Sequence, residues 1–265
     1  MHNFAYHKPA SLADAAALLA SHEDAKLLAG GQTYIPTLKQ RLAQPSDIVD
    51  LGGIAELKGI KEEAGGVTVG AMTTHGEVAE SAVVKRVIPA LAALAHLIGD
   101  PAVRNRGTLG GSISNNDPAA DYPGACLALG ATIRTSKREI KADDFFSGMF
   151  ETALERDEIV KAVHFPKADK AAYEKFRNPA SRYAMVGVFI SRIGSSVRVA
   201  VTGAGQGGAY RWTAAEQALA GNWSAAALDG LTVSSDDLNS DIHASAEYRA
   251  HLVKVIAKRA LAKAG

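Results

Sequence analysis

The chain has 265 residues, 47% of them hydrophobic and 22% charged, which is typical of a globular protein long enough to form two domains. Its formal net charge of +1 gives no charge footprint for nucleic acid or for an acidic membrane surface, and we expect neither as a partner. The single cysteine, Cys126, excludes a disulfide framework, a cysteine-based zinc site and an iron–sulfur cluster within this chain.

The first fifty residues predict a compact strand–helix–strand unit. After an extended piece at Phe4–His7, Ser11 is expected to cap a helix whose apolar residues recur with helical spacing from Leu12. A strand, a helix and a second strand are then predicted at Lys26–Ala29, Ile35–Leu42 and Asp47–Leu51. A parallel pair of strands would place the Gly30-Gly31 turn at a strand's carboxyl end, where α/β proteins tend to bind ligands.

Hairpins and helices alternate in the middle of the chain. Two strands flank the turn signal at residues 63–66, Thr74 is expected to cap a helix, and Pro89 interrupts a longer helix. The predicted elements are Gly59–Glu62, Val67–Gly70, a helix near His75–Glu80, helices Val83–Ile98 and Ala119–Leu129, a hairpin of Ala131–Thr135 with Glu139–Ala142, and a strand at Glu158–Phe165.

A polar, alanine-rich segment at Lys167–Ala172 marks the expected domain boundary. The strands predicted beyond it are Tyr173–Phe176, Met185–Ile193 and Ser196–Thr202, and the helices are Ala214–Ala220, Ala225–Leu228 and Ala246–Lys263. A glycine cluster at 203–208 follows the last strand without a helix behind it, and we interpret it as a loop of the second domain.

Two other glycine-rich stretches have the chemistry of a ligand site. Residues 107–117 carry glycines, hydroxyl residues and asparagines, and residues 27–33 run from an apolar strand into Gly-Gly-Gln-Thr. Glycines allow close backbone approach, and successive N–H groups in such turns form anion sites. Neither stretch fits the G-x-x-x-x-G-K-[ST] or G-x-G-x-x-G pattern. Each alone is more often a plain turn, whereas the two together favour a ligand with two phosphates.

Sequence patterns typical of metal sites, serine hydrolases and membrane spans are missing. The 8 histidines include no H-x-x-x-H pair, no G-x-S-x-G elbow occurs, and no apolar stretch reaches the roughly 18 residues of a membrane span. Asp117 before Pro118 is expected to start a helix, and Asp121 could accept hydrogen bonds from a sugar hydroxyl. Residues 1–4 do not resemble a secretory signal, so we expect a cytoplasmic protein. A nucleotide-like ligand that brings its own chemistry fits this pattern.

The two glycine motifs together resemble one family. Ala29-Gly30-Gly31-Gln32-Thr33 is similar to its A-G-G-[QH]-[ST] loop, and Thr108-Leu109-Gly110-Gly111-Ser112 to its T-[IL]-G-G-[NS] loop. This is the FAD-binding medium subunit of the molybdenum hydroxylases (the xanthine oxidase family), particularly its CO-dehydrogenase branch. Segments 103–107, 115–121 and 178–184 resemble that branch too, and the similarity runs from about residue 3 to the C-terminus.

The resemblance implies an α+β fold and a set of FAD-binding residues. It implies an N-terminal FAD-binding region, residues 1–170, in two α/β subdomains (about 1–56 and 57–170), followed by a C-terminal domain of antiparallel sheet and helices, 171–265. The two loops would hold the pyrophosphate and Asp121 would contact the nucleotide part. Val160, Lys175 and Tyr183 would lie near the isoalloxazine. The implied set is Leu27, Leu28, Ala29, Gly30, Gly31, Gln32, Thr33, Thr108, Gly110, Gly111, Ser112, Asp121, Val160, Lys175 and Tyr183.

The same resemblance implies partner subunits and a role in electron transfer. A large subunit with a molybdenum cofactor and a small subunit with two [2Fe–2S] clusters would join this chain, as a dimer of heterotrimers. Electrons would run from molybdenum through the clusters to FAD and then to an external acceptor. Two alternatives stay open, a self-contained flavin oxidase of related fold and a non-catalytic nucleotide-binding module. The substrate is not encoded here, because it would bind the partner subunit.

Overall fold

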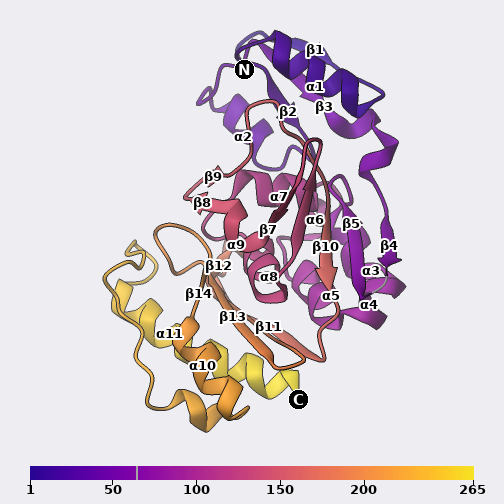
Figure 1. Cartoon of the computed structure of the whole chain (residues 1–265). Helices are drawn as coiled ribbons and strands as arrows, with labels where there is room; N and C mark the ends of the chain where they lie inside the picture. Colours follow the sequence, from indigo (N-terminus) through magenta and orange to yellow (C-terminus); the bar gives the residue numbers. More distant parts are fainter. Residues whose placement is uncertain (64) are drawn as a thin grey trace.

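The N-terminal unit is a small parallel sheet with two crossover helices. This computed structural model describes residues 1–63 and 65–265 (Figure 1). The strands, in spatial order β1-β3-β2, are all parallel, and Ser11 caps the first helix by accepting from the Asp14 N–H. The elements are β1 (Ala5–His7), α1 (Leu12–Ser21), β2 (Lys26–Leu28), α2 (Tyr34–Lys39) and β3 (Asp47–Asp50). The predicted crossover unit is confirmed, with the glycine turn at the carboxyl end of β2.

A five-stranded antiparallel sheet follows, in the order β4-β5-β10-β6-β7. It is reached through the short turns η1 (Leu51–Gly53) and η2 (Ala55–Leu57). The strands are β4 (Ile60–Glu63), β5 (Gly66–Gly70), β6 (Thr132–Thr135), β7 (Glu139–Lys141) and β10 (Val160–Pro166). Both predicted hairpins are present, and Ala64 in the turn of the first lies outside the described residues.

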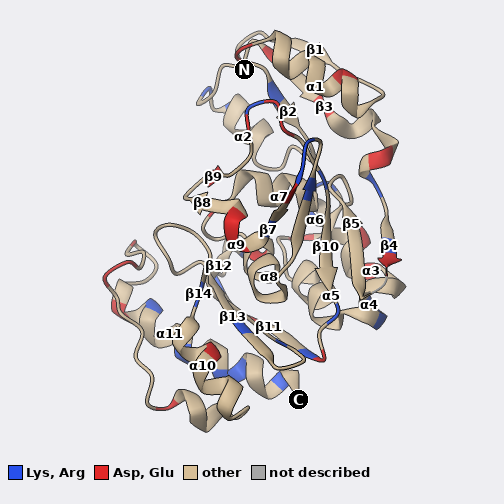
Figure 2. Ribbon diagram, viewed as in Figure 1, with Lys and Arg blue, Asp and Glu red and all other residues tan. Residues whose placement is uncertain are grey.

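Short helices cover one face of this sheet and enclose the main core. They are α3 (His75–Glu80), α4 (Ala82–Val87), α5 (Pro89–His96), α6 (Pro101–Arg104), α7 (Leu109–Asn115), α8 (Asp121–Leu129) and α9 (Ala142–Phe145). Helix α8 is buried along its whole length, and Asp121 in its first turn is its only charged residue (Figure 2). A small hairpin, β8 (Phe146–Gly148) with β9 (Glu151–Thr152), was not predicted.

The C-terminal part is a four-stranded antiparallel sheet, in the order β11-β12-β13-β14. Its elements are β11 (Lys170–Arg177), β12 (Ala184–Ile193), β13 (Ser196–Thr202), β14 (Tyr210–Arg211), α10 (Thr213–Gly221), η3 (Ala225–Leu228) and α11 (Ala246–Ala264). Helices α10 and α11 pack on one face, while α5 and α8 pack on the other. Val188 of β12 therefore faces the C-terminal core and Phe189 the main core, as side chains alternate along a strand.

The predicted break of the helix Val83–Ile98 at Pro89 is confirmed, because Pro89 starts α5 as its first residue. Two other sequence-based expectations were wrong in detail. The run after Thr108 is not only a loop, since the Thr108 side chain caps α7. Asp117 does not cap α8, which begins at Asp121; its Oδ1 instead accepts from the Ala119 N–H at 2.8 Å and closes a turn ahead of the helix.

The predicted domain boundary falls between two strands. Strand β10 ends at Pro166 and β11 begins at Lys170, but the main core continues across this point through Tyr173 and Phe189. The division into domains therefore stays a prediction. Over residues 1–63 and 65–265, none of the helices combines the length and apolar character needed to cross a membrane, and no group of three His, Cys, Asp or Glu side chains is placed to hold a metal ion.

Candidate functional site

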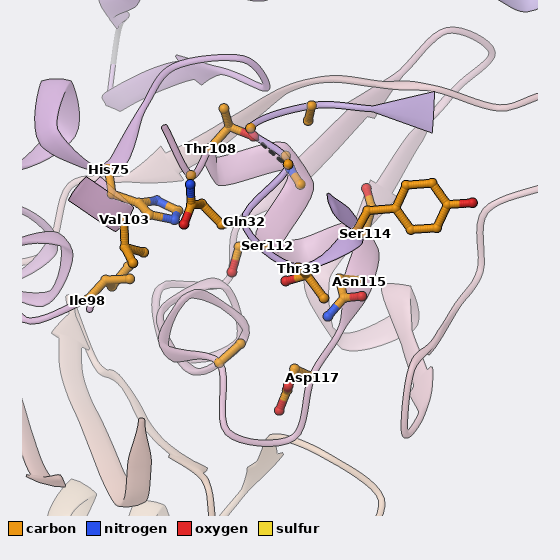
Figure 3. A pocket seen from close by; sticks show the side chains of 18 of the residues that line it. Gln32, Thr33, His75, Ile98, Val103, Thr108, Ser112, Ser114, Asn115 and Asp117 are labelled. Atoms are coloured by element: carbon orange, nitrogen blue, oxygen red, sulfur yellow. Dashed lines mark hydrogen bonds between the residues drawn. The ribbon is translucent and has the colours of Figure 1, made fainter. Parts of the chain in front are cut away.

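A cavity of about 660 Å³ lies where residues of the parallel sheet, of the five-stranded and four-stranded sheets and of α7 meet (Figure 3). All the residues that the family resemblance implied as FAD contacts line it. They are Leu27, Leu28, Ala29, Gly30, Gly31, Gln32, Thr33, Thr108, Gly110, Gly111, Ser112, Asp121, Val160, Lys175 and Tyr183. The glycine cluster at 203–208 contributes nothing to this lining among the described residues.

The first loop, after β2, presents a row of unused backbone donors. The N–H groups of residues 30–34 make no hydrogen bond to another described residue, and the next N–H, that of Ile35, donates to the Gly31 carbonyl oxygen at 3.1 Å. Gly31 has a φ of +75°, and a Cβ there would lie 2.6 Å from Ile35 Cδ1. Consecutive free N–H groups on a tight turn form a concave anion site.

The second loop does not present free backbone donors at residues 109–112. This differs from the expectation that both loops would do so. Every N–H of residues 109–112 donates inside the protein, to the Thr73 and Ala71 carbonyl oxygens, to Thr108 Oγ1 and to the Thr108 carbonyl oxygen. The backbone of α7 is thus already satisfied at its start. This loop can therefore contact a ligand through side chains, and Figure 3 shows the Ser112 hydroxyl pointing into the cavity.

The two loops are in direct contact, and glycine is required where they meet. A Cβ on Gly30 would lie 2.0 Å from the Arg106 carbonyl oxygen, which ordinary packing never allows. On the other side, a Cβ on Gly111 would lie 3.3 Å from the Cβ of Ala29 and 2.9 Å from Thr108 Oγ1. The loops therefore form one continuous wall of the cavity rather than two separate sites.

A buried ion pair closes the far part of the cavity. Lys175 Nζ on β11 donates to Asp121 Oδ2 at 2.9 Å and to the Leu97 carbonyl oxygen at 3.3 Å. The side chains of Lys175 and Asp121 are 2% and 4% exposed, and the Tyr173 hydroxyl donates to the other carboxylate oxygen. Burial raises the pKa of Asp121, and the Lys175 ammonium opposes that shift. An ammonium carries three N–H bonds, so one stays available to a ligand.

Comparison with known proteins agrees with this geometry. The family model described as "FAD binding domain in molybdopterin dehydrogenase" matches residues 2–168, and "CO dehydrogenase flavoprotein C-terminal domain" matches residues 171–264. The chain belongs to this flavoprotein family. The family predicted from the two glycine motifs is therefore confirmed.

Named relatives and solved structures cover almost the whole chain. The nicotine 6-hydroxylase medium subunit of Paenarthrobacter nicotinovorans is 38% identical over 98% of this chain and 96% of its own. The carbon monoxide dehydrogenase medium chain of Hydrogenophaga pseudoflava is 39% identical over 75% of this chain and 74% of its own. The carbon monoxide dehydrogenase structure from that organism superposes with a TM-score of 0.89 at 35% identity, covering 99% of this chain and 97% of that one.

FAD is the cofactor of this flavoprotein family, and the cavity fits it. The row of free N–H groups at residues 30–34 suits a pyrophosphate, and the space beside it is kept clear by glycines. Apolar walls at Leu27 and Met72 and the polar pair Lys175–Asp121 offer different surroundings to the two ring systems of FAD.

The lining residues of this flavoprotein's cavity that the sequence did not reveal include His75 and Phe150. His75 lines the wall near Gly107, and only its position next to the predicted cap Thr74 hinted at a fixed place. Phe150, 55% exposed, sits in the hairpin turn between β8 and β9 with a φ of +58°. The buried Asn116 holds that hairpin by donating to the Gly148 and Glu151 carbonyl oxygens at 2.7 and 2.8 Å, a contact no local pattern reveals.

Proposed function

We propose that this chain is the FAD-carrying electron-transfer subunit of a heteromeric molybdenum hydroxylase. Electrons would arrive from the [2Fe–2S] clusters of a partner subunit, pass through FAD and leave to an external acceptor. One observation supports the assignment most: the unused N–H groups of residues 30–34 lie in the one cavity whose lining includes every residue that the family resemblance implied.

The residues of this chain bind and position the cofactor, and FAD supplies a redox centre that exchanges one or two electrons. The N–H groups of residues 30–34 bind the pyrophosphate, and the Ser112 hydroxyl adds a donor from the second loop. Since Gly30 lies directly against the Arg106 carbonyl, the first loop is fixed in place by the second. The anion site is therefore formed before the ligand arrives, which lowers the entropic cost of binding.

We assign Lys175 and Tyr183 to the isoalloxazine end of the cavity. Asp121 is hydrogen-bonded to Lys175, so it acts at the same end, where it orients the ammonium, instead of at the nucleotide part that the resemblance implies. Val160 belongs to the main core and lines the cavity, and we propose that it contacts the isoalloxazine, as the resemblance implies.

The substrate of the complex is proposed to bind elsewhere. Relatives that align over most of this chain are named for nicotine, carbon monoxide, glyceraldehyde and caffeine, which share no chemical group that one pocket would recognise. The relatives named for nicotine, carbon monoxide and glyceraldehyde are all medium chains or medium subunits. We propose large molybdenum-cofactor and small iron–sulfur subunits as partners, in a cytoplasmic dimer of heterotrimers, and two domains meeting near residues 170–171.

Composition of the native assembly tests this role. When the chain is purified with its natural partners, molybdenum, iron and FAD should co-elute in a constant ratio. The isolated chain should hold FAD, yet no substrate of the assembly should bleach its flavin, because the substrate is proposed to bind a partner subunit. Bleaching of the isolated flavoprotein by such a substrate would favour the self-contained oxidase, and absence of molybdenum and iron from the assembly would contradict the proposal.

Tyr183 is proposed to cover one face of the flavin ring. Its side chain is 46% exposed, lines the cavity and follows Arg182, whose φ is +62°. A tyrosine stacked on the ring contributes about 1 kcal/mol beyond burial. Tyr183→Ala is expected to speed reoxidation of the reduced flavin by small acceptors and to alter its absorption spectrum in stopped-flow measurements. The control is Tyr248→Ala, a 44% exposed tyrosine on α11 outside the cavity lining. Unchanged spectrum and rate for Tyr183→Ala would rule out the stacked position.

A further inference from the structure

We propose that His75 is a positioning residue of the flavin pocket, whose imidazole forms a hydrogen bond to the ring end of bound FAD. This inference rests on the proposed function, and it adds a residue that neither glycine motif contains. His75 lacks hydrogen-bond partners among the described residues, lies against a glycine, and is connected through the cavity wall to the Lys175 end.

The imidazole of His75 is buried without a protein partner. His75 is only 5% exposed, and neither of its ring nitrogens forms a hydrogen bond to another described residue. The Nδ1 atom is also shielded from solvent. Buried polar groups without a partner are rare, because each costs roughly 1–3 kcal/mol. Nε2 also has no partner among the described residues but is not shielded in this way, so a ligand in the cavity can complete the hydrogen bonding of the ring through this atom.

The Nε2 edge of the His75 ring lies against Gly107. A Cβ on Gly107 would lie 2.6 Å from Nε2, so the glycine leaves room for this edge of the ring. Gly107 and His75 both line the cavity, and the His75 N–H donates to the Gly107 carbonyl oxygen at 2.9 Å, which fixes the start of α3 against the second loop. In Figure 3 the ring projects towards the Gln32 side chain.

Contacts along the wall connect the surroundings of His75 to the Lys175 end. The Val103 side chain packs against Gly99, and the Val103 carbonyl oxygen accepts a hydrogen bond from the Gly107 N–H at 2.7 Å. These contacts join residues 99–107 into one wall segment. The Gly99 carbonyl oxygen accepts from Arg182, and that of Leu97 accepts from Lys175. Ile98 and Val103 add apolar lining beside the ring of His75 (Figure 3). A polar edge within apolar walls suits a flat heterocycle such as isoalloxazine.

Charge explains why a histidine suits this position. Burial, together with the nearby Arg104 guanidinium, lowers the pKa of His75 to about 4, so the imidazole is neutral at pH 7. A neutral imidazole can donate from one nitrogen and accept at the other. It can therefore meet a polar edge of the flavin without adding a second positive charge beside Lys175.

Two substitutions separate a hydrogen bond from packing. His75→Leu and His75→Gln both remove the ring that packs on Tyr122, at a centroid distance of 5.4 Å, but only glutamine keeps a polar group near the Nε2 position. The dissociation constant for FAD would be measured by flavin fluorescence on the full chain stripped of flavin. We expect His75→Leu to weaken binding about tenfold, equivalent to 1.4 kcal/mol, and to shift the flavin absorption bands. His75→Gln should recover most of both.

The control is His164→Leu, a partly buried histidine on β10 outside the cavity lining, which should leave FAD affinity unchanged. Equal FAD affinity and identical flavin spectra for wild type, His75→Leu and His75→Gln would overturn the inference and leave the proposed function standing. Equal losses in both variants would assign His75 to packing alone. If the wild-type chain binds no FAD, the proposed function itself fails.

Discussion

Asp121→Ala is expected to lower the free energy of unfolding by about 3–5 kcal/mol, the typical cost of leaving a buried charge without its partner. The substitution removes the counter-charge of Lys175, whose side chain is 2% exposed, and also the acceptor of the Tyr173 hydroxyl. Urea-induced unfolding at pH 7, followed by far-UV circular dichroism, measures the effect. FAD affinity should fall as well, because the ammonium loses the group that orients it.

A second variant shows whether the loss comes from the unpaired ammonium. Lys175→Met in the Asp121→Ala background removes the unpaired cation and should recover part of the lost stability, since an apolar side chain tolerates burial. Asp143→Ala is the matched control, because Asp143 pairs with Arg198 at 2.9 Å but its side chain is 37% exposed. Surface pairs contribute little to stability. If Asp121→Ala is no more destabilising than Asp143→Ala, the buried pair does not have the role assigned to it.

Gly30→Ala is expected to abolish retention of FAD during purification and to destabilise the chain by about 1–3 kcal/mol, the usual range for overpacking. The added methyl group would lie 2.0 Å from the Arg106 carbonyl oxygen, so one of the two loops must move. Movement separates the free N–H groups of residues 30–34 from the Ser112 side chain, and the anion site is lost. Flavin content after gel filtration and thermal unfolding of the same sample measure both effects.

Gly207→Ala provides the control for this substitution. Gly207 belongs to the other glycine cluster, and a Cβ there meets no described heavy atom within 4 Å. Its substitution should leave FAD content and thermal unfolding unchanged. Full flavin content in Gly30→Ala would show that contact between the two loops does not determine cofactor binding.

Local patterns allowed most of the fold and the cavity's first wall to be predicted. The parallel unit follows from helical spacing after Ser11 and from short apolar strands, and the glycine turn lies where a parallel strand ends. The region after Thr108 was harder to interpret. Its glycines suggested a loop, but the Thr108 side chain caps a helix whose first N–H groups bond to Thr73 and Ala71, residues far back in the chain.

The parts of the site that sequence patterns did not reveal depend on contacts between distant residues. Asp121 and Lys175 are paired across 54 positions, and the resemblance had placed them at different parts of FAD. His75 gave no signal of its own, because its burial depends on Gly107 and Tyr122 brought together by folding. Spacing rules act within one element, whereas these contacts are made by packing between elements.

Flavin release from the purified chain tests the central claim most directly. Acid precipitation of the isolated protein should release all of its yellow colour as FAD, one molecule per chain, because the cavity holds the cofactor through N–H groups and side chains without a covalent bond. Titration of the flavin-free chain should then show saturation by FAD at one equivalent and much weaker binding of FMN, which lacks the second phosphate and the adenosine. Release of FMN, flavin that stays on the precipitated protein, or no binding of FAD would contradict the assignment.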